Sequence, residues 1–333
     1  MLTILISAPY LLPLMDRFRP ILESYGLELI IAQVQERLEE EQIQAFAGKY
    51  DGTICGDDRY TARALHACSP RLKVISKWGT GIDAIDQQAA VSLGIQIYRT
   101  PNAFTLPVAD SVLGYMLAFA RRQPKMDREM KAGRWAKIPG VSLSESSLGV
   151  VGLGNIGKAV ILRARAFGMQ ILGNDIVEIA HDFLDENAVE MVGLEDLLAR
   201  SDFVSLNCDL NPTSLHLINA HTLGLMKPTS ILINAARGSI VDESALIQAL
   251  QTGQICGAAL DVFEHEPLPA TSPLLQMDNV LLAPHNANSS PKAWEYVHLN
   301  TLRNLLEGLC IDSHNLEYKI SQTQNTKRTD HAK

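Results

Sequence analysis

The sequence lacks the features that mark secreted, metal-binding and nucleic-acid-binding proteins. Among its 333 residues are only five cysteines, scattered without the spacing of metal ligands. We therefore expect free thiols in a reduced, cytoplasmic protein, and no metal site. The net charge of −8 argues against a nucleic-acid partner, which would need a basic face. A small anionic substrate remains compatible with this charge, because a few local cations suffice to bind it.

Long apolar runs and low-complexity segments are missing as well. No run approaches the roughly 20 residues that cross a bilayer, so we expect no membrane partner. Residues 2–7 are apolar, but the run is short and no basic segment precedes it, which favours a first β-strand over a signal peptide. The sequence is 47% apolar and 20% charged, which is typical of a globular protein. Its length indicates two domains of about 100–200 residues each.

Two series of short apolar runs alternate with amphipathic stretches, a pattern typical of parallel strands covered by helices. Between the series, residues 104–122 have the pattern of a long apolar helix. We predict an α/β fold of two doubly wound, Rossmann-like parallel-sheet domains with a ligand-binding cleft between them. The predicted strands are 2–7, 27–32, 52–55, 73–76 and 95–98 in the first series, and 148–152, 169–174, 188–192, 202–206, 230–234, 256–261 and 280–283 in the second.

The domain limits follow from the same patterns. A last helix is predicted over 291–308, and we expect it to return to the first domain. That domain, which would hold the substrate, is then discontinuous and comprises residues 1–101 and 288–333, while residues 102–287 form the dinucleotide-binding domain. The two crossings between the domains predict a hinge, and we expect closure on ligand binding to expel water from the site.

A glycine motif opens the second series. The strand from Leu148 runs into Gly152-x-Gly154-x-x-Gly157, and a helix-compatible segment follows at once. Gly152 allows a tight turn, Gly154 lets the backbone approach a pyrophosphate, and Gly157 lets helix and strand pack closely. The helix N-terminus then offers unpaired N–H groups and a partial positive charge to phosphates.

Asp175 makes this motif more specific, because a glycine triplet alone can be a mere structural turn. It stands at the end of the strand that follows the helix. A carboxylate there can accept hydrogen bonds from both ribose hydroxyls and would repel a 2′-phosphate. The pattern therefore predicts NAD as the cofactor in preference to NADP.

Three later strands each run into a residue suited to catalysis. Arg237 follows an apolar strand, and its planar guanidinium suits bidentate binding of a carboxylate. Residues 261–267 contain three acids and a histidine, and His285 follows another strand and a proline. Each has a structural alternative when taken alone: a surface arginine in a turn, a solvated acidic loop and a structural histidine.

Together these segments resemble the D-isomer-specific 2-hydroxyacid dehydrogenase family, and its phosphoglycerate dehydrogenase branch most closely. The resemblance covers nearly the whole chain. Its motifs occur in the same order as in the family, which makes a chance similarity very unlikely. The motifs are Lys77-Trp-Gly-Thr-Gly-Ile-Asp83-Ala-Ile-Asp86, Thr100-Pro101, Val108-Ala109-Asp110, the glycine motif, Asn234-Ala-Ala-Arg-Gly238, Val241-Asp242-Glu243, Ala259-Leu-Asp-Val-Phe-Glu264, Glu266-Pro267 and Ala283-Pro-His285.

The resemblance implies that Arg237, Glu266 and His285 are the catalytic residues of an NAD-dependent oxidoreductase. Arg237 would bind the substrate carboxylate and polarise the carbonyl at C2. His285 would donate a proton to that oxygen while the nicotinamide delivers hydride to C2. Glu266, hydrogen-bonded to the other ring nitrogen, would raise the pKa of the histidine above about 6.5.

The resemblance also implies the remaining contacts. Cofactor contacts would come from Val108, Gly152, Gly154, Asn155, Ile156, Gly157, Asp175, Cys208, Ala235, Ala236 and Asp261, the last of these holding the nicotinamide carboxamide. Substrate contacts would come from Lys77, Trp78, Gly79, Thr80 and Arg237. Lys77 suits a phosphate but is equally compatible with a solvated surface lysine. Trp78 departs from the family pattern, which often has a small residue there, so substrate identity is the open question.

Three functions remain, in order of preference. The first is a dehydrogenase for 3-phosphoglycerate and 3-phosphohydroxypyruvate, and the second a reductase for glyoxylate, hydroxypyruvate or another small 2-keto acid. The third, from another class, is an NAD-sensing protein like the corepressors built on this fold. By resemblance we expect a homodimer in which the helix 104–122 and the segment to Ser147 embrace the partner, with Trp135 as an anchor. A core helix within one subunit is the alternative.

Overall fold

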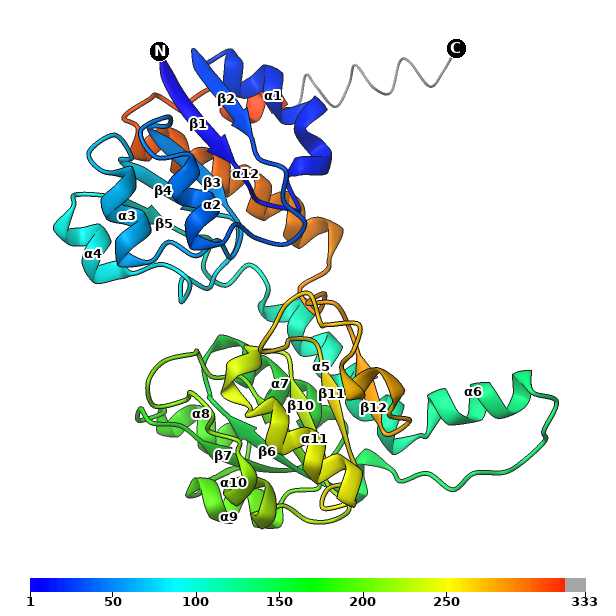
Figure 1. Ribbon diagram of the computed structural model, residues 1–333. Helices are drawn as coiled ribbons and strands as arrows, with labels where there is room; N and C mark the ends of the chain where they lie inside the picture. Colours follow the sequence, from blue (N-terminus) through cyan, green and yellow to red (C-terminus); the bar gives the residue numbers. More distant parts are fainter. Residues whose placement is uncertain (321–333) are drawn as a thin grey trace. The chain divides into compact units, whose positions relative to one another are not determined.

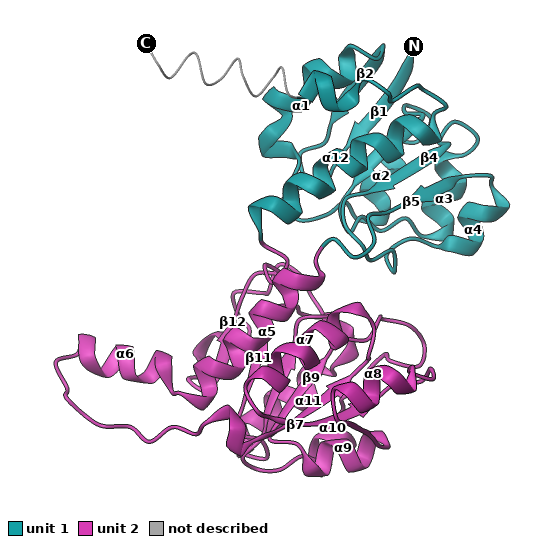
Figure 2. Ribbon diagram, turned by 180° about the vertical axis from the view of Figure 1, so that it is seen from behind, with its two compact units in different colours: residues 1–103, 290–333 teal, residues 104–289 magenta. Residues whose placement is uncertain are grey.

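The computed structural model describes residues 1–320 and divides the chain into two compact units (Figures 1 and 2). Unit 1 comprises Met1–Ala103 and resumes at Ser290, and unit 2 comprises Phe104–Ser289. Each boundary lies two residues beyond the one expected from the sequence. Residues 321–333, which the expected first domain includes, lie outside the described part.

Unit 1 contains a five-stranded parallel sheet in the order β2-β1-β3-β4-β5. Its strands are β1 (Leu2–Ile6), β2 (Leu27–Ile31), β3 (Gly52–Cys55), β4 (Val74–Lys77) and β5 (Gln96–Tyr98). Its helices are η1 (Leu12–Leu14), α1 (Met15–Glu23), α2 (Glu40–Ala45), α3 (Ala62–Cys68), α4 (Gln87–Ser92) and α12 (Pro291–Gly308).

Helix α12, which follows unit 2 in the chain, packs on β3, β4 and β5 of unit 1. It starts where the sequence favours a helix start, with Ser290 accepting a hydrogen bond from the backbone N–H of Ala293 and Pro291 in the first turn. At its other end Gly308 lies so close to the sheet that a Cβ there would come within 2.7 Å of Val74 Cγ1. The segment that returns from unit 2 therefore completes the core of unit 1.

Unit 2 contains a seven-stranded parallel sheet in the order β12-β11-β10-β9-β6-β7-β8. Its strands are β6 (Ser147–Val151), β7 (Gln170–Asn174), β8 (Val189–Met191), β9 (Phe203–Leu206), β10 (Ile231–Asn234), β11 (Gly257–Leu260) and β12 (Val280–Leu282). Its helices are α5 (Thr105–Ala120), α6 (Gln123–Lys131), η2 (Leu143–Glu145), α7 (Asn155–Ala166), α8 (His181–Glu186), α9 (Leu194–Arg200), α10 (Ala220–Leu225), η3 (Gly238–Ile240), α11 (Glu243–Thr252) and η4 (Pro273–Gln276).

The prediction of two parallel α/β sheets is confirmed, and every predicted strand is present. In unit 2 the strand order reverses at β6, which lies between β7 and β9. Ligands of such sheets bind at the carboxyl ends of the strands where the order reverses. Within the described residues, no helix is long and apolar enough to cross a membrane.

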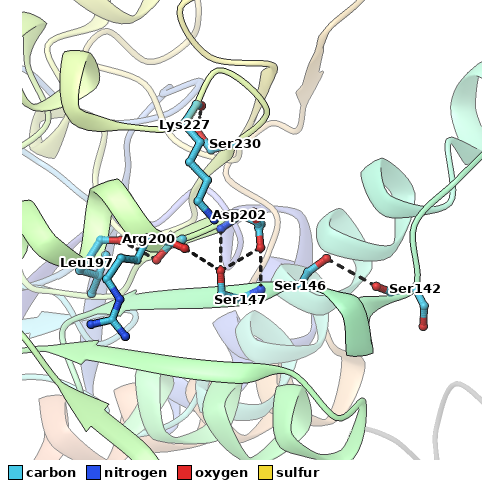
Figure 3. Close-up of polar contacts among 9 residues, drawn as sticks. Ser142, Ser146, Ser147, Leu197, Arg200, Asp202, Lys227 and Ser230 are labelled. Carbon is cyan, nitrogen blue, oxygen red and sulfur yellow. Dashed lines mark hydrogen bonds and ion pairs between the residues drawn. The ribbon is translucent and has the colours of Figure 1, made fainter.

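A polar network pins the amino ends of β6 and β9 together (Figure 3). Asp202 accepts hydrogen bonds from the backbone N–H and the hydroxyl of Ser147, both at 2.8 Å, and from Lys227 Nζ at 2.8 Å. Burial alone would raise the pKa of Asp202, but the bonds from Lys227 and Ser147 hold it below its usual range. This network holds β9 in register with β6, whose opposite end runs into the glycine turn.

The segment between α5 and β6 stands apart from the rest of unit 2. Helix α5 packs on α7, whereas α6 contains no buried residue and projects from the unit (Figures 1 and 2). Three large apolar side chains of this segment are exposed, namely Met130, Trp135 and Val141. An isolated helix of this length is only marginally stable in water.

Candidate active site

The three glycines of the motif differ in what surrounds them. Gly152 has a φ of 88°, and a Cβ there would lie 2.6 Å from the backbone nitrogen of Cys208. A Cβ on Gly157 would lie 2.0 Å from the carbonyl oxygen of Gly152. Gly154, by contrast, has nothing within 4 Å of its Cβ position and caps the N-terminus of α7. The backbone at Gly154 is therefore open to close approach, and the predicted contact with a pyrophosphate stays a prediction.

Asp175 lies beside this turn, at the end of β7. Its Oδ2 accepts a hydrogen bond from the backbone N–H of Leu153 at 2.6 Å, and its Oδ1 accepts one from Val177 at 3.0 Å. The carboxylate is therefore held next to the glycine turn, and its contact with a ribose stays a prediction.

The other predicted cofactor residues of unit 2 lie in three places. Asn155 and Ile156 form the first turn of α7, Ala235 and Ala236 follow β10, and Val108 is buried on α5. Cys208 follows β9 beside the glycine turn, and burial raises the pKa of its thiol to about 11. That thiol stays protonated near neutral pH, so only its backbone is suited to a cofactor contact.

Arg237 lies in a turn that Asn234 organises. The Asn234 side chain accepts a hydrogen bond from the backbone N–H of Ala236 at 3.1 Å and donates one to the carbonyl of Arg237 at 2.9 Å. The next residue, Gly238, touches the following loop so closely that a Cβ would lie 1.9 Å from the carbonyl carbon of Phe263. The turn after β10 thus packs directly on the loop after β11. Sequence reasoning missed Asn234 as a positioning residue, although its place before Arg237 was a usable signal.

Glu266 and His285 are in direct contact. His285 Nδ1 lies 2.9 Å from Glu266 Oε2, while Glu266 Oε1 accepts a hydrogen bond from the backbone N–H of Phe263 at 3.0 Å. The side chains are only 14% exposed for Glu266 and 20% for His285. A carboxylate beside Nδ1 sets the tautomer with the proton on that nitrogen, which leaves Nε2 for a reacting group.

The backbone N–H groups of three successive residues, 285–287, all donate hydrogen bonds to Asp261. His285 donates to the carbonyl of Asp261 at 2.7 Å, Asn286 to its Oδ1 at 2.9 Å and Ala287 to its Oδ2 at 2.8 Å. His285 itself has a φ of 51°, a left-handed conformation that side chains other than glycine rarely adopt. Asp261 is 1% exposed. Its predicted contact with the nicotinamide carboxamide stays a prediction, because the structure shows its carboxylate holding the loop of His285.

The predicted substrate loop lies in unit 1, after β4. Gly79 has a φ of 121°, and its carbonyl accepts a hydrogen bond from the backbone N–H of Thr100 at 2.8 Å. The Thr80 hydroxyl donates to the carbonyl of Thr100 at 2.8 Å, so the loop is tied to the segment after β5. Trp78 is buried, and its indole N–H donates to His298 Nδ1 at 2.9 Å.

The structure contradicts one of the two interpretations of Lys77, and its contact with a phosphate stays a prediction. Lys77 is neither a solvated surface lysine nor a free cation, because the residue is only 4% exposed. Its Nζ lies 3.1 Å from Asp57 Oδ1 and donates to the carbonyl of Trp78 at 3.0 Å. The charge available for a phosphate is therefore already neutralised within unit 1.

Comparison with known proteins agrees with this geometry. Residues 113–287 match the family model described as the NAD-binding domain of D-isomer-specific 2-hydroxyacid dehydrogenases. A glyoxylate reductase of Korarchaeum cryptofilum is 42% identical over 67% of this chain and 68% of its own. A D-3-phosphoglycerate dehydrogenase of Methanocaldococcus jannaschii is 38% identical over 84% of this chain but only 53% of its own length. The chain thus spans about half of that relative.

A solved structure shows the same fold. The D-lactate dehydrogenase of Aquifex aeolicus, complexed with NAD and lactic acid, superposes with a TM-score of 0.78 at 28% identity. The match covers 90% of this chain and 93% of that one. Both units of the chain therefore have counterparts in a protein that binds the cofactor predicted from Asp175.

Proposed function

This chain belongs to the D-isomer-specific 2-hydroxyacid dehydrogenase family and is an NAD-dependent oxidoreductase, and from that premise we propose that it interconverts an unphosphorylated 2-keto acid and its D-2-hydroxy acid. The observation that carries the reaction is the contact between His285 and Glu266 at the carboxyl edge of the unit 2 sheet. The turn of Arg237 lies on the adjacent strand end of the same sheet.

Each of the three residues has one task in this reaction. Arg237 binds the substrate carboxylate and polarises the C2 carbonyl. His285 donates the proton of Nε2 to the C2 oxygen and removes it again in the oxidative direction. Glu266 orients the imidazole and stabilises its charged form. When bound, NAD supplies or accepts the hydride.

The pairing of Lys77 with Asp57 supports an unphosphorylated substrate over 3-phosphohydroxypyruvate, the preferred substrate of the sequence analysis. A phosphate that bound Lys77 would have to compete with Asp57 for the buried cation. A phosphate would also approach the carboxylate of Asp57, which repels it. The structure thus favours the second candidate, the class of keto acids that includes glyoxylate and hydroxypyruvate.

The catalytic assignment predicts a large loss for His285→Ala. We expect kcat to fall by about 10²–10⁴-fold, because the general acid is removed, while NADH binding is kept. Steady-state NADH oxidation and a fluorescence titration of NADH measure the two effects. The control is His221→Ala, at an exposed histidine in α10. Activity that survives His285→Ala would exclude this residue as the proton donor.

Substrate choice is tested by kcat/KM with NADH for phosphohydroxypyruvate, hydroxypyruvate, glyoxylate and pyruvate. We expect the unphosphorylated acids to have the higher values. Lys77→Met, which keeps the length of the side chain, should affect the phosphorylated and unphosphorylated acids equally. A selective loss with phosphohydroxypyruvate would restore the phosphate-binding role of Lys77.

We further propose that the protein is a homodimer and that the arm of α6 is the interface. Two observations support this proposal. Helix α6 has no residue buried within its own subunit, and Trp135 is 84% exposed. A second copy of the chain would cover both, as the family resemblance implies.

A further inference from the structure

Three aromatic side chains cluster at the carboxyl edge of the unit 1 sheet. Tyr10 follows β1, Trp78 follows β4, and Trp294 stands in the first turn of α12. The rings of Tyr10 and Trp78 are stacked, with centroids 4.8 Å apart and an interplanar angle of 30°. The ring of Trp294 lies 5.1 Å from Tyr10 and 6.0 Å from Trp78. We refer to these three residues as the aromatic wall.

The position of the aromatic wall distinguishes it from ordinary core packing. The core of unit 1 contains aromatic side chains such as Tyr50 and Tyr60, and these are fully buried. Tyr10 and Trp294 are only half-buried, although burying large rings is strongly favourable. They also lie at the carboxyl edge of a parallel sheet, where such folds bind ligands.

Hydrogen bonds to residues of α12 hold the aromatic wall in place. Arg17 on α1 makes two hydrogen bonds to Glu295, at 2.8 and 2.5 Å, which hold the residue next to Trp294. The indole N–H of Trp78 is satisfied by His298, two turns of α12 away from the helix start. Both contacts reduce the motion of the rings, so a ligand that contacts them loses little binding energy in ordering the site.

The charged residues that directly adjoin Trp78 and Trp294 in the chain are paired. Lys77 is buried and paired with Asp57, and Glu295 is paired with Arg17. Trp78 is itself buried and uses its indole N–H internally, so the partly exposed rings of Tyr10 and Trp294 provide the contact surface. A surface of this kind favours an uncharged apolar group, and an aromatic ring above all, because ring pairs gain energy beyond the burial of their area.

We propose that the aromatic wall contacts the substituent at C3 of the substrate, and that the preferred substrate is a 2-keto acid with an aromatic side chain. Trp78 leads directly into Gly79 and Thr80, which are predicted substrate contacts. The rings thus stand beside the predicted substrate loop, and Trp294 and Tyr10 determine specificity. This inference rests on the proposed function and narrows its substrate class.

The test compares kcat/KM with NADH for phenylpyruvate, 4-methyl-2-oxopentanoate and glyoxylate. We expect phenylpyruvate to be the best of the three. Trp294→Ala should lower kcat/KM for phenylpyruvate by about 10-fold or more, mainly through KM, and change the value for glyoxylate by less than about 3-fold. Trp294→Phe, which keeps a ring, should retain most of the preference.

The matched control is Tyr296→Ala, which removes an exposed ring two residues away on the same helix. It should change kcat/KM for neither phenylpyruvate nor glyoxylate. Circular dichroism shows whether each variant is folded. If glyoxylate is preferred, or if Trp294→Ala lowers both values equally, the inference falls and the proposed function stands. If phosphohydroxypyruvate is preferred, the inference and the unphosphorylated substrate class both fall. If no 2-keto acid is reduced, the proposed function itself fails.

Discussion

At the scale of single residues, His285 shows how a strained backbone is held. A left-handed conformation costs a residue other than glycine about 1–3 kcal/mol, and it persists only where the surroundings impose it. Here Asp261 imposes it by accepting hydrogen bonds from residues 285–287. The buried carboxylate therefore decides where the imidazole points.

Asp261→Asn should separate positioning from cofactor binding. The amide has one acceptor oxygen, so one of the two N–H groups now bound by the carboxylate faces an N–H₂ group instead. A displaced loop should lower kcat by on the order of 10²-fold, with little change in NADH affinity. Tyr115→Phe is the control, because it removes only a hydroxyl that lies 3.4 Å from Asp261 Oδ1. A loss of NADH affinity as large as the loss of kcat would instead support the nicotinamide contact.

His298 makes stability depend on pH. Burial lowers its pKa to about 4, below the usual value of about 6.5, so the unfolded chain binds the extra proton between these pH values. The free energy of unfolding should therefore fall as the pH drops from about 6.5 to 4. Asp58 has the opposite effect, because burial raises its pKa to about 6. As the pH rises toward that value, the unfolded chain loses the proton that the folded chain keeps, so this carboxyl lowers the free energy of unfolding.

His298→Gln isolates the contribution of the histidine, since glutamine accepts the bond from Trp78 but does not titrate. Between pH 7 and 4 the variant should lose less stability than the wild type, with a difference of up to about 3 kcal/mol. Urea unfolding at several pH values measures this difference. The exposed His181→Gln is the control and should leave the curve unchanged. Parallel curves for wild type and His298→Gln would show that the histidine is not neutral in the folded state.

At the scale of elements, the strand–turn–helix from β6 to α7 is where sequence and structure agree best. Each of its three glycines is required for a different reason, and the sequence pattern predicts a reason for each. The Cβ distances at Gly152 and Gly157 show that two are needed for folding, whereas Gly154 faces open space. The pattern is local, so neighbouring residues alone specify it.

Alanine at two of these glycines should have opposite consequences. Gly157→Ala should strongly reduce thermal stability, because the new Cβ would overlap the carbonyl oxygen of Gly152. Gly154→Ala should leave the fold intact and weaken NADH binding, by about 10-fold or more, because the methyl group fills the space of the pyrophosphate. Thermal unfolding and NADH titration of both variants check this contrast. Equal effects of the two substitutions on binding would argue against a cofactor in front of Gly154.

Element ends were less predictable than element types. The helix predicted over 104–122 spans Thr105–Ala120. The strand predicted over 188–192 is the shorter Val189–Met191. Apolar spacing predicts the presence of an element, whereas capping bonds and tertiary packing decide where it ends.

At the scale of the whole molecule, the arm of unit 2 predicts the oligomeric state. We expect a dimer by light scattering coupled to size exclusion. Met130→Asp combined with Trp135→Asp should give a monomer, because two charges would be buried in the proposed interface. Val91→Asp, at an exposed position in α4 of unit 1, is the control. A wild-type monomer, or a dimer that survives the double substitution, would exclude this arm as the interface.

The sequence by itself determined the two parallel sheets, NAD as the cofactor and the candidate residues Arg237, Glu266 and His285. These depend on local patterns: apolar runs, glycine spacing and residues placed directly after strands. Only the tertiary structure decided which residues Lys77 and Trp78 contact. Their partners, Asp57 and His298, lie 20 and 220 residues away in the chain. A sequence pattern does not show which distant charges and rings come into contact. The reaction could therefore be predicted from the sequence, whereas the choice of substrate depends on how the chain folds.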